Sequence, residues 1–265
     1  MNKIERQKEF FNSISDEYFK ARKNKNHVFY KELLWSSVLS DVREVVYKHT
    51  TNKVDVLEMM CGYAEGEKIV KKYITKDYAY TGFDYSDKVI DRVKQINPEL
   101  DVYIQDVTQY APEKKYDIII IMGGLHHVPD SVDNVLHKIF QSLNWGGVFI
   151  NVEPTHNNII YAKIRNAIYK KNHIFDEKTE HDFELRNLNN RYKRSGLKLM
   201  QQYHVGLLAY ILYYNPDAFS ILNIGNKKLV ALLQKVDKIF YQNIIGQKLS
   251  FATFSILEKT KKQKL

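Results

Sequence analysis

The chain has 265 residues, 44% of them hydrophobic, with 40 lysines and arginines against 31 acidic residues and a formal net charge of +9. Its single cysteine, Cys61, excludes an internal disulfide, and no apolar stretch approaches the roughly 18 residues that a membrane span needs. The charged start, Met1 to Lys8, lacks the apolar core of a signal peptide. We therefore expect a cytoplasmic protein without stable membrane insertion.

The excess of positive charge has two explanations. One is a lysine-rich solvated surface, and the other is an anionic substrate, such as a phosphorylated or nucleotide-linked metabolite. Runs such as Arg22-Lys23-Asn24-Lys25 and Lys170-Lys171 contribute to the charge, as does the lysine-rich stretch 258–265. Nucleic acid is less favoured, because the chain contains no recognised nucleic-acid module and no clustered basic–aromatic stripe. The sequence assigns no metal ligands and no oligomeric state.

Strands and helices alternate along the first part of the chain. Residues 1–25 carry one helical pattern, which includes Phe10, Phe11, Ile14, Tyr18 and Phe19, and residues 28–48 predict an amphipathic helix. Apolar strands are predicted at 54–59, 78–83, 102–105, 116–122 and 147–152. Helices are predicted between them at 64–74, 86–96 and 131–143. This alternation predicts an α/β fold with a doubly wound, mostly parallel sheet and helices on both faces.

The alternation loosens after residue 153. Residues 154–185 are polar, aromatic and basic, and include Arg165, Tyr169 and His173. A helix at 185–195, a strand at 197–204, an apolar stretch at 206–225 and a helix at 227–241 follow. The helix at 227–241 has an apolar side, made of Leu229, Leu232, Leu233, Val236, Ile239 and Phe240. The last predicted strand is 249–257.

The most informative motif runs from Val54 to Gly66, a buried strand that enters a glycine-containing turn and then a helix. Such a turn lets backbone N–H groups approach a ligand closely. A second acid, Asp84, ends the next apolar run after Glu58. This order of strand, turn, helix, strand and acid is typical of a Rossmann-like nucleotide site, in which the acid binds ribose hydroxyls.

Further polar residues follow the later strands. Asp106 comes after the third strand, His126 and His127 come after the fourth, and Glu153 ends the fifth. Open α/β sheets bind ligands at the carboxyl ends of their strands, so we expect these side chains near one site.

Two of these segments carry a family resemblance. The Tyr116-Asp117 aliphatic run is followed by Leu125-His126-His127-Val128-Pro129-Asp130, and the turn Trp145-Gly146-Gly147 precedes the fifth strand. With the glycine turn, they resemble the class I S-adenosylmethionine-dependent methyltransferases that act on small molecules. The resemblance covers about residues 30–155. It implies a Rossmann-like sheet of seven strands and S-adenosylmethionine as the cofactor.

The resemblance also implies a role for individual positions. The cofactor-binding residues would be Glu58 and Gly62 for the methionine portion, Asp84 with Tyr85 for the ribose, Asp106 with Val107 for the adenine, and Gly123 for the ammonium. Carboxylates and carbonyls suit these groups because they accept the hydrogen bonds that hydroxyls and ammonium donate. Tyr18 would reach the cofactor from the N-terminal segment. The turn departs from the three-glycine pattern of the family at Met60 and Ala64.

The domain organisation follows from the same comparison. We expect one domain over 1–265, with residues 1–27 as a helical segment over the cofactor and residues 28–153 as the cofactor-binding core. Residues 154–185 and 206–246 would be substrate cap insertions, because lids that exclude water are often built from such segments. Residues 249–257 would be the final strand of the sheet.

Methyl transfer to an oxygen benefits from a base, and an imidazole suits that task. His127 is the first candidate for base or orienting residue, with His126 and Glu153 as alternatives. The predicted cofactor-binding acids also have structural explanations. Glu58 could be an ion-pair partner, Asp84 a helix cap and Asp106 a loop acid.

We expect a small polar or anionic methyl acceptor, such as a sugar, nucleotide-linked or phosphate-bearing precursor of a cell-surface polysaccharide. A quinone or lipid acceptor is the alternative, motivated by the apolar residues 206–222, and N-methylation is another. Because Met60 stands where the family has glycine, an alternative function of a different class is a non-catalytic protein that binds S-adenosylmethionine. A nicotinamide-dependent oxidoreductase is disfavoured, because the turn lacks Gly-x-Gly-x-x-Gly.

Overall fold

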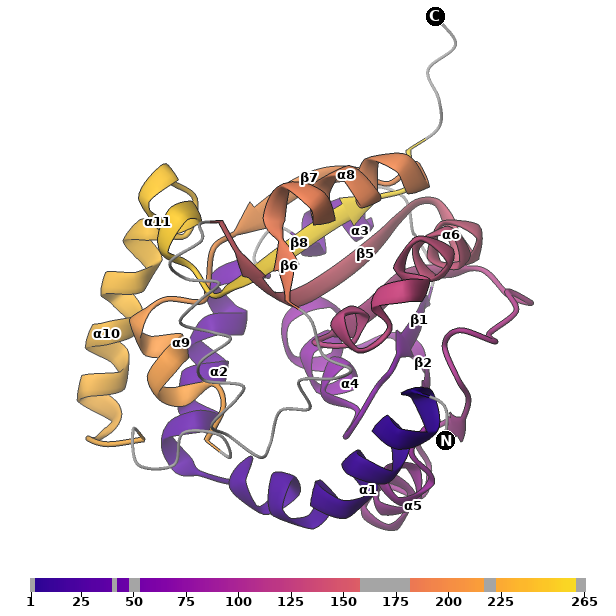
Figure 1. Cartoon of the computed structure of the whole chain (residues 1–265), viewed down its shortest axis with the longest axis horizontal. Helices are drawn as coiled ribbons and strands as arrows, with labels where there is room; N and C mark the ends of the chain where they lie inside the picture. Colours follow the sequence, from indigo (N-terminus) through magenta and orange to yellow (C-terminus); the bar gives the residue numbers. More distant parts are fainter. Residues whose placement is uncertain (1–2, 40–41, 48–52, 158–181, 217–222, 261–265) are drawn as a thin grey trace, which may run out of the picture.

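The computed structural model describes residues 3–39, 42–47, 53–157, 182–216 and 223–260 (Figure 1). Most of the predicted cap insertion 154–185, including Arg165, Tyr169 and His173, lies outside these residues. Residues 217–222 of the second predicted insertion and the lysines at 261–264 lie outside them as well.

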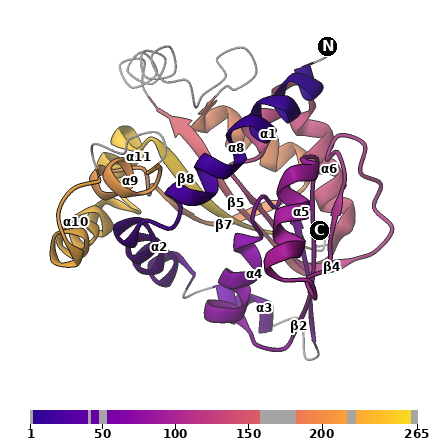
Figure 2. The ribbon, with the colours of Figure 1, turned by 90° about the horizontal axis from the view of Figure 1, so that it is seen from below.

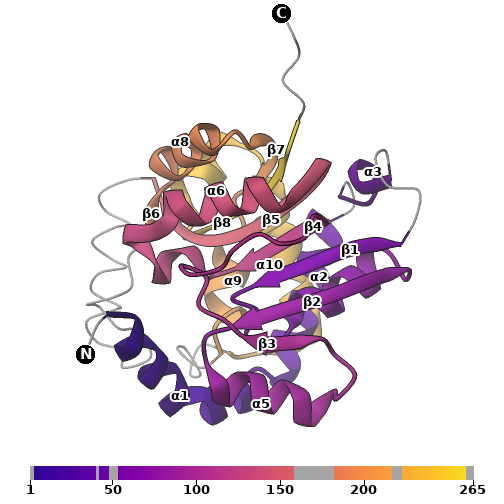
Figure 3. The same cartoon turned by 90° about the vertical axis from the view of Figure 1, so that its right-hand side faces the viewer.

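A mostly parallel sheet forms the centre of the molecule (Figures 1 and 3). Its strands follow the order β3-β2-β1-β4-β5-β8-β7, and the short strand β6 pairs with β5 off this path. The last two pairings, β5 with β8 and β8 with β7, are antiparallel. The strands are β1 (Val54–Met59), β2 (Tyr78–Asp84), β3 (Val102–Ile104), β4 (Tyr116–Met122), β5 (Leu143–His156), β6 (Phe183–Glu184), β7 (Lys198–Tyr203) and β8 (Ala252–Glu258).

The predicted α/β, doubly wound fold is confirmed, and the seven-stranded path is extended by β6 to eight strands. The sequence did not predict β6, because two residues are too short for a periodic signal. The helices of the first half are α1 (Lys3–Ala21), α2 (Lys25–Val38), α3 (Val42–Tyr47), α4 (Glu65–Ile69), α5 (Asp87–Ile96) and α6 (Val132–Ser142). Those of the second half are α8 (Leu185–Ser195), α9 (Leu208–Tyr213), α10 (Lys227–Phe240) and α11 (Ile244–Leu249).

Helices cover both faces of the sheet because successive strand residues point to opposite sides. Val56 and Ile118 belong to one core, which also contains buried residues of α2, α4 and α5. Leu57 and Ile119 belong to the other core, which contains buried residues of α6 and α8. Figure 3 shows these layers above and below the strands, and Figure 2 shows α9, α10 and α11 gathered beside α2.

The strand order reverses between β1 and β4, which pair in parallel. At such a switch point the connections on either side lead to opposite faces and leave a crevice at the carboxyl ends of the strands. The turn after β1 and the turn after β4 therefore meet at this crevice.

The predicted apolar side of the helix at 227–241 is only partly buried, since Leu233 and Phe240 pack against the core but three of its other members are exposed. Leu232, Val236 and Ile239 are 57%, 41% and 70% exposed, whereas the buried side of α10 carries Val230, Gln234 and Asp237. Asp237 accepts hydrogen bonds from the backbone N–H groups of Leu208 and Ala209 at 3.2 and 2.7 Å. Gln234 bonds the Tyr241 hydroxyl at 2.8 Å. These polar partners allow a polar side of the helix to be buried.

Candidate active site

The turn after β1 adopts left-handed backbone conformations at three positions. Met60, Gly62 and Ala64 have φ angles of 54°, 50° and 55°. A non-glycine residue costs about 1–2 kcal/mol in this region because its Cβ approaches the following carbonyl. Met60 and Ala64 thus stand where the family has glycine, and the turn retains the shape that glycine would give it.

The Met60 side chain packs against the turn after β4, at Gly124. A Cβ added to Gly124 would lie 2.9 Å from Met60 Sδ, so the missing side chain of Gly124 leaves room for Met60. Met60 packs against the core on the α6 side of the sheet and lines the pocket described below. Gly124, which has no side chain, therefore makes room for the larger Met60 in the turn after β1.

Glu58 is buried beneath this turn and holds it in place. Its carboxyl oxygens accept the Gly66 N–H at 2.9 and 3.0 Å, and one of them accepts the Tyr80 hydroxyl at 2.5 Å. A Cβ at Gly66 would lie 2.7 Å from Glu58 Cδ, so only glycine allows this approach. Among the described residues Glu58 forms no salt bridge, the predicted alternative, since its partners there are a backbone amide and a hydroxyl.

Burial raises the pKa of Glu58 from 4.5 to about 8, although the Tyr80 and Gly66 hydrogen bonds oppose the shift. Since the folded pKa lies above the unfolded one, the stability contributed by protonated Glu58 is full below about pH 4.5. It is lost as the pH rises through 8. We expect the free energy of unfolding to fall across this interval, and the Glu58→Gln variant to lack that decline. Urea unfolding at several pH values measures both; parallel curves for the two proteins would contradict the assignment.

Asp84 and Asp106, the acids at the ends of the next two strands, accept different hydrogen bonds. Asp84 is buried and accepts hydrogen bonds from the backbone N–H groups of Gly62 and Ser86, both at 3.0 Å. It thus ties the end of β2 to the glycine turn, while Ser86 itself caps α5. Asp106 accepts the Thr108 N–H at 2.7 Å within its own turn. The Val107 side chain lies in the core.

Helix α1 lies against the glycine turn. The Tyr63 hydroxyl donates to the Ser15 carbonyl at 2.8 Å, and the rings of Tyr18 and Tyr63 stack 6.1 Å apart. Asn12 on the same helix accepts from the Ser86 hydroxyl at 2.5 Å. The helix therefore spans the ends of β1 and β2, and Tyr18 lines the pocket there.

A histidine–carboxyl pair joins the turn after β4 to the end of β5. His126 Nδ1 lies 2.9 Å from Glu153 Oε2. The other Glu153 oxygen accepts the N–H groups of Gly124 and Leu125 at 3.2 and 2.9 Å and the Asn151 amide at 3.1 Å. Because Glu153 accepts at Nδ1, that nitrogen carries the hydrogen and Nε2 is left as a proton acceptor.

His127 lies beside this pair, with its ring centroid 3.9 Å from that of His126. Burial, together with the neighbouring His126, lowers the pKa of His127 well below its usual 6.5. A histidine in this setting stays neutral but is a weak base. The hydrogen bond from Glu153 to His126 Nδ1 and the lowered pKa of His127 separate the two candidates.

One pocket of about 950 Å³ opens at the carboxyl ends of β1, β4 and β5. This volume is near the upper end of the range for ligand sites, roughly 300–1,000 Å³. It brings together seven of the predicted site residues: Tyr18, Glu58, Gly62, Gly123, His126, His127 and Glu153. The other four, Asp84, Tyr85, Asp106 and Val107, lie outside its lining, although Asp84 contacts the turn through Gly62.

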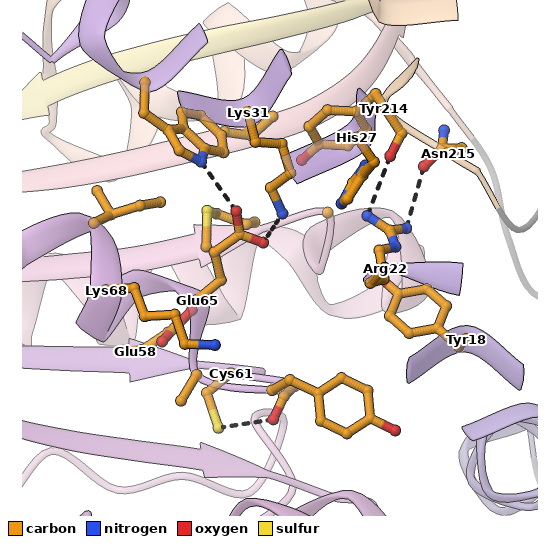
Figure 4. Close-up of a pocket in the computed structure, with 18 of the residues that line it drawn as sticks. Tyr18, Arg22, His27, Lys31, Glu58, Cys61, Glu65, Lys68, Tyr214 and Asn215 are labelled. Atoms are coloured by element: carbon orange, nitrogen blue, oxygen red, sulfur yellow. Dashed lines mark hydrogen bonds and ion pairs between the residues drawn. The ribbon is translucent and has the colours of Figure 1, made fainter. Parts of the chain in front are cut away.

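The far wall of the pocket carries Arg22 and Tyr214, which the sequence did not predict as site residues, beside the predicted Tyr18 (Figure 4). The Arg22 guanidinium lies 4.3 Å from the Tyr18 ring centroid and donates to the Tyr214 carbonyl and Asn215 Oδ1, both at 3.3 Å. Lys68 and Lys31 reach the same space from α4 and α2. This wall can receive an anionic or aromatic group.

A half-buried ion pair fixes one side of that wall. Glu65 bonds the Lys31 ammonium and accepts the Trp35 indole N–H at 3.0 Å. Burial opposes ionisation of Glu65, but the charge of Lys31 and the hydrogen bonds from Lys31 and Trp35 together outweigh it and lower the pKa of Glu65. Lys31 and Glu65 are 34 residues apart, so no local sequence signal could have paired them. Within the described ranges, no three histidine, cysteine or carboxylate side chains group as metal ligands.

Residues 56–147 match the family model described as a methyltransferase domain, and they run from β1 into β5. This stretch contains the glycine turn, Asp84 and the two histidines. This stretch therefore matches a methyltransferase domain, as the sequence motifs predict, and S-adenosylmethionine is the cofactor of the class that those motifs resemble.

Curated relatives match about half of the chain. Malonyl-[acyl-carrier protein] O-methyltransferase 1 of Ilyobacter polytropus is 24% identical over 134 residues, which are 49% of this chain and 48% of the relative. Demethylmenaquinone methyltransferase of Listeria welshimeri is 25% identical over 150 residues, 51% of this chain and 63% of the relative. The chain thus spans less than two thirds of the length of either protein.

Solved structures share the fold over most of the chain. An S-adenosylmethionine-dependent methyltransferase from Clostridium acetobutylicum has a TM-score of 0.58 at 11% identity, over 95% of this chain and 98% of that one. The cyclopropane synthase MmaA2 from Mycobacterium tuberculosis has a TM-score of 0.58 at 13% identity, over 83% and 84%. At these identities the likeness concerns the fold.

Proposed function

We propose that this protein transfers a methyl group from S-adenosylmethionine to a nucleophilic oxygen of a small molecule. The observation that carries the proposal is the His126–Glu153 pair, which lies in the same pocket as the glycine turn after β1. A base whose tautomer is fixed by a carboxyl group, beside a cofactor site, is the arrangement that deprotonation of an acceptor requires.

The residues of the turn fit the cofactor. A Cβ added to Gly62 would meet no atom within 4 Å, so this backbone faces open space. Asp84 and Asp106 offer carboxylate acceptors to the ribose hydroxyls and the adenine amino group, and Tyr85 and the Val107 backbone flank them. Glu58 and the Gly123 carbonyl would serve the methionine ammonium, with Tyr18 closing the site from α1.

When bound, S-adenosylmethionine supplies an electrophilic methyl group with a good leaving group, so the protein has to position the nucleophile and exclude water. His126 Nε2 would accept the proton of the acceptor hydroxyl, and Glu153 would hold the ring and stabilise its protonated form. We assign the base to His126 rather than to His127. Glu153 fixes the orientation of His126, whereas the lowered pKa of His127 makes it a weak base.

The acceptor we propose is a small molecule with an anionic group. Arg22, Lys31 and Lys68 could pair with the anion, while Tyr210 and Tyr214 supply an aromatic wall. None of the relatives points to a polysaccharide precursor. The names of the two relatives described above refer to malonyl-[acyl-carrier protein] and to demethylmenaquinone.

A quinone or lipid acceptor is the second candidate. Tyr210 and Tyr214 of the α9 region stack with centroids 4.3 Å apart and line the pocket together with Ile211. A flat aromatic acceptor could extend this stack. The cap roles of residues 154–185 and 206–246 remain predictions. Of their described residues, the pocket is lined by Pro154, Tyr210, Ile211, Tyr214 and Asn215.

The proposal is tested by cofactor binding and by product release. We expect S-adenosylhomocysteine, but not NAD, to bind in calorimetry and to raise the melting temperature. Release of S-adenosylhomocysteine from S-adenosylmethionine is then followed with a panel of malonyl thioesters, demethylated naphthoquinols, phenols and sugar phosphates. Binding without turnover on any acceptor class would favour a non-catalytic protein.

The Asp84→Asn variant tests the placement of the ribose. We expect it to weaken S-adenosylhomocysteine binding about tenfold or more, because a charged acceptor becomes a neutral one. Asp101→Asn is the matched control, since Asp101 is exposed and accepts from the Thr81 hydroxyl at the middle of β2. Equal affinities for the two variants would overturn the placement.

A further inference from the structure

Helix α10 presents an apolar stripe to the solvent. Leu232, Val236 and Ile239 are separated by four and three residues, so they lie on one side of a helix with 3.6 residues per turn. They are 57%, 41% and 70% exposed, which is unusual for three large apolar side chains in a row. The opposite side of the helix, with Val230, Gln234 and Asp237, packs inward.

The next helix enlarges this surface. Ile244, Ile245 and Leu249 of α11 are 61%, 50% and 42% exposed. Only Tyr241, Gln242 and Asn243 separate the two helices, which lie in contact at the same end of the molecule (Figures 1 and 2). We refer to the exposed apolar residues of α10 and α11 as the α10–α11 face.

The charge around this face has one sign. Lys228 and Lys235 lie on the outward side of α10, and Lys227 and Lys238 are exposed beside it. Asp237 is the one acidic residue between Ile224 and Leu249, all of which the structure describes, and it is buried. An exposed apolar stripe bordered by lysines, without exposed acids, is the pattern of helices that lie in the interface of an anionic bilayer.

We propose that the α10–α11 face docks this protein on the surface of a membrane that contains anionic lipids. The apolar side chains would enter the boundary between headgroups and acyl chains, while the lysines pair with lipid phosphates. A second copy of the chain fits less well, because the lysines of two such faces would repel each other. None of the described helices is long and apolar enough to cross a bilayer.

Docking through the α10–α11 face would bring the pocket close to the bilayer. Helix α10 packs against α9, and Tyr210 and Ile211 of α9 line the pocket. Docking through the outward side of α10 would leave that pocket one helix away from the bilayer. An acceptor that partitions into lipid would then be held near the protein that consumes it.

The test is flotation of the full chain with vesicles of phosphatidylcholine alone or of equal parts phosphatidylcholine and phosphatidylglycerol. We expect binding to the anionic vesicles, weakened by added salt, and little binding to the neutral ones. The Lys228→Gln/Lys235→Gln variant should bind the anionic vesicles roughly 30-fold more weakly, from about 1 kcal/mol per lysine at such a surface. The Leu232→Gln/Ile239→Gln variant should lose flotation at every salt concentration.

Matched controls are Lys198→Gln and Leu199→Gln, an exposed lysine and an exposed leucine on β7. Both should float like the wild type, and all four variants should retain the melting temperature and bind S-adenosylhomocysteine equally. Equal flotation with neutral and anionic vesicles, no flotation at all, or α10 variants that behave like the β7 controls would overturn the proposal. So would self-association of the lipid-free chain that the α10 substitutions abolish, or equal competition by soluble polyglutamate, which would indicate an acidic protein partner.

Discussion

The His126→Ala variant is expected to lose about 10²- to 10⁴-fold in methyl transfer while it binds S-adenosylhomocysteine like the wild type. The loss follows from removing the nitrogen that would accept the acceptor proton. It does not follow from a change in the cofactor site, since Glu58, Gly62 and Asp84 belong to other elements. Single-turnover rates with an acceptor found in the panel, together with calorimetry, measure the two quantities separately.

His127→Ala is the comparison that decides between the two histidines. The lowered pKa of His127 makes it a weak base, so its removal should cost less activity than removal of His126. If His127→Ala lost more activity than His126→Ala at equal cofactor affinity, the base assignment would have to move to His127. Similar full activity in both variants would indicate an acceptor that needs no base.

Replacing Glu153 by leucine should lower the free energy of unfolding by about 3 kcal/mol or more. Glu153 is 1% exposed and accepts hydrogen bonds from Gly124, Leu125, Asn151 and His126. Leucine accepts none, so several buried donors would be left without a partner, and each costs roughly 1–3 kcal/mol. Urea unfolding monitored by circular dichroism measures the change.

Two further variants separate the structural role of Glu153 from its effect on His126. Asp133→Leu removes an exposed acid that pairs with Arg191 at 3.0 Å and should change stability by about 1 kcal/mol at most. Glu153→Gln keeps one acceptor oxygen for the backbone amides but can place a donor against Nδ1. It should therefore reduce turnover more than stability. A Glu153→Leu protein as stable as the Asp133→Leu control would show that this network does not hold the turn after β4.

Much of the fold could be predicted because it rests on local patterns. The bounds of β1, β4 and α8 agree with the predicted 54–59, 116–122 and 185–195. Continuous apolar runs and helical spacing depend only on residues close together in the sequence, so they can be recognised without the tertiary structure. The carboxyl-end position of the site residues followed from the parallel alternation, because parallel strands end at the same edge.

The packing side of α10 could not be predicted in this way. Leucine and isoleucine spacing indicated one side, but tertiary partners buried another, since Asp237 caps the start of α9 and Gln234 bonds Tyr241. A periodic pattern shows that a helix has two faces. It does not show which face meets the rest of the protein when polar residues find buried partners.

The sequence by itself determined the class of the domain, the cofactor that this class uses and the edge of the sheet where the site lies. Only the tertiary structure showed how Met60 is accommodated, with a left-handed backbone and the space at Gly124. It also brought Lys31 to Glu65 and Glu153 to His126, pairs that are 34 and 27 residues apart. The reason is physical: local patterns report the backbone and its faces, whereas the chemistry of a site depends on distances between residues far apart in the chain.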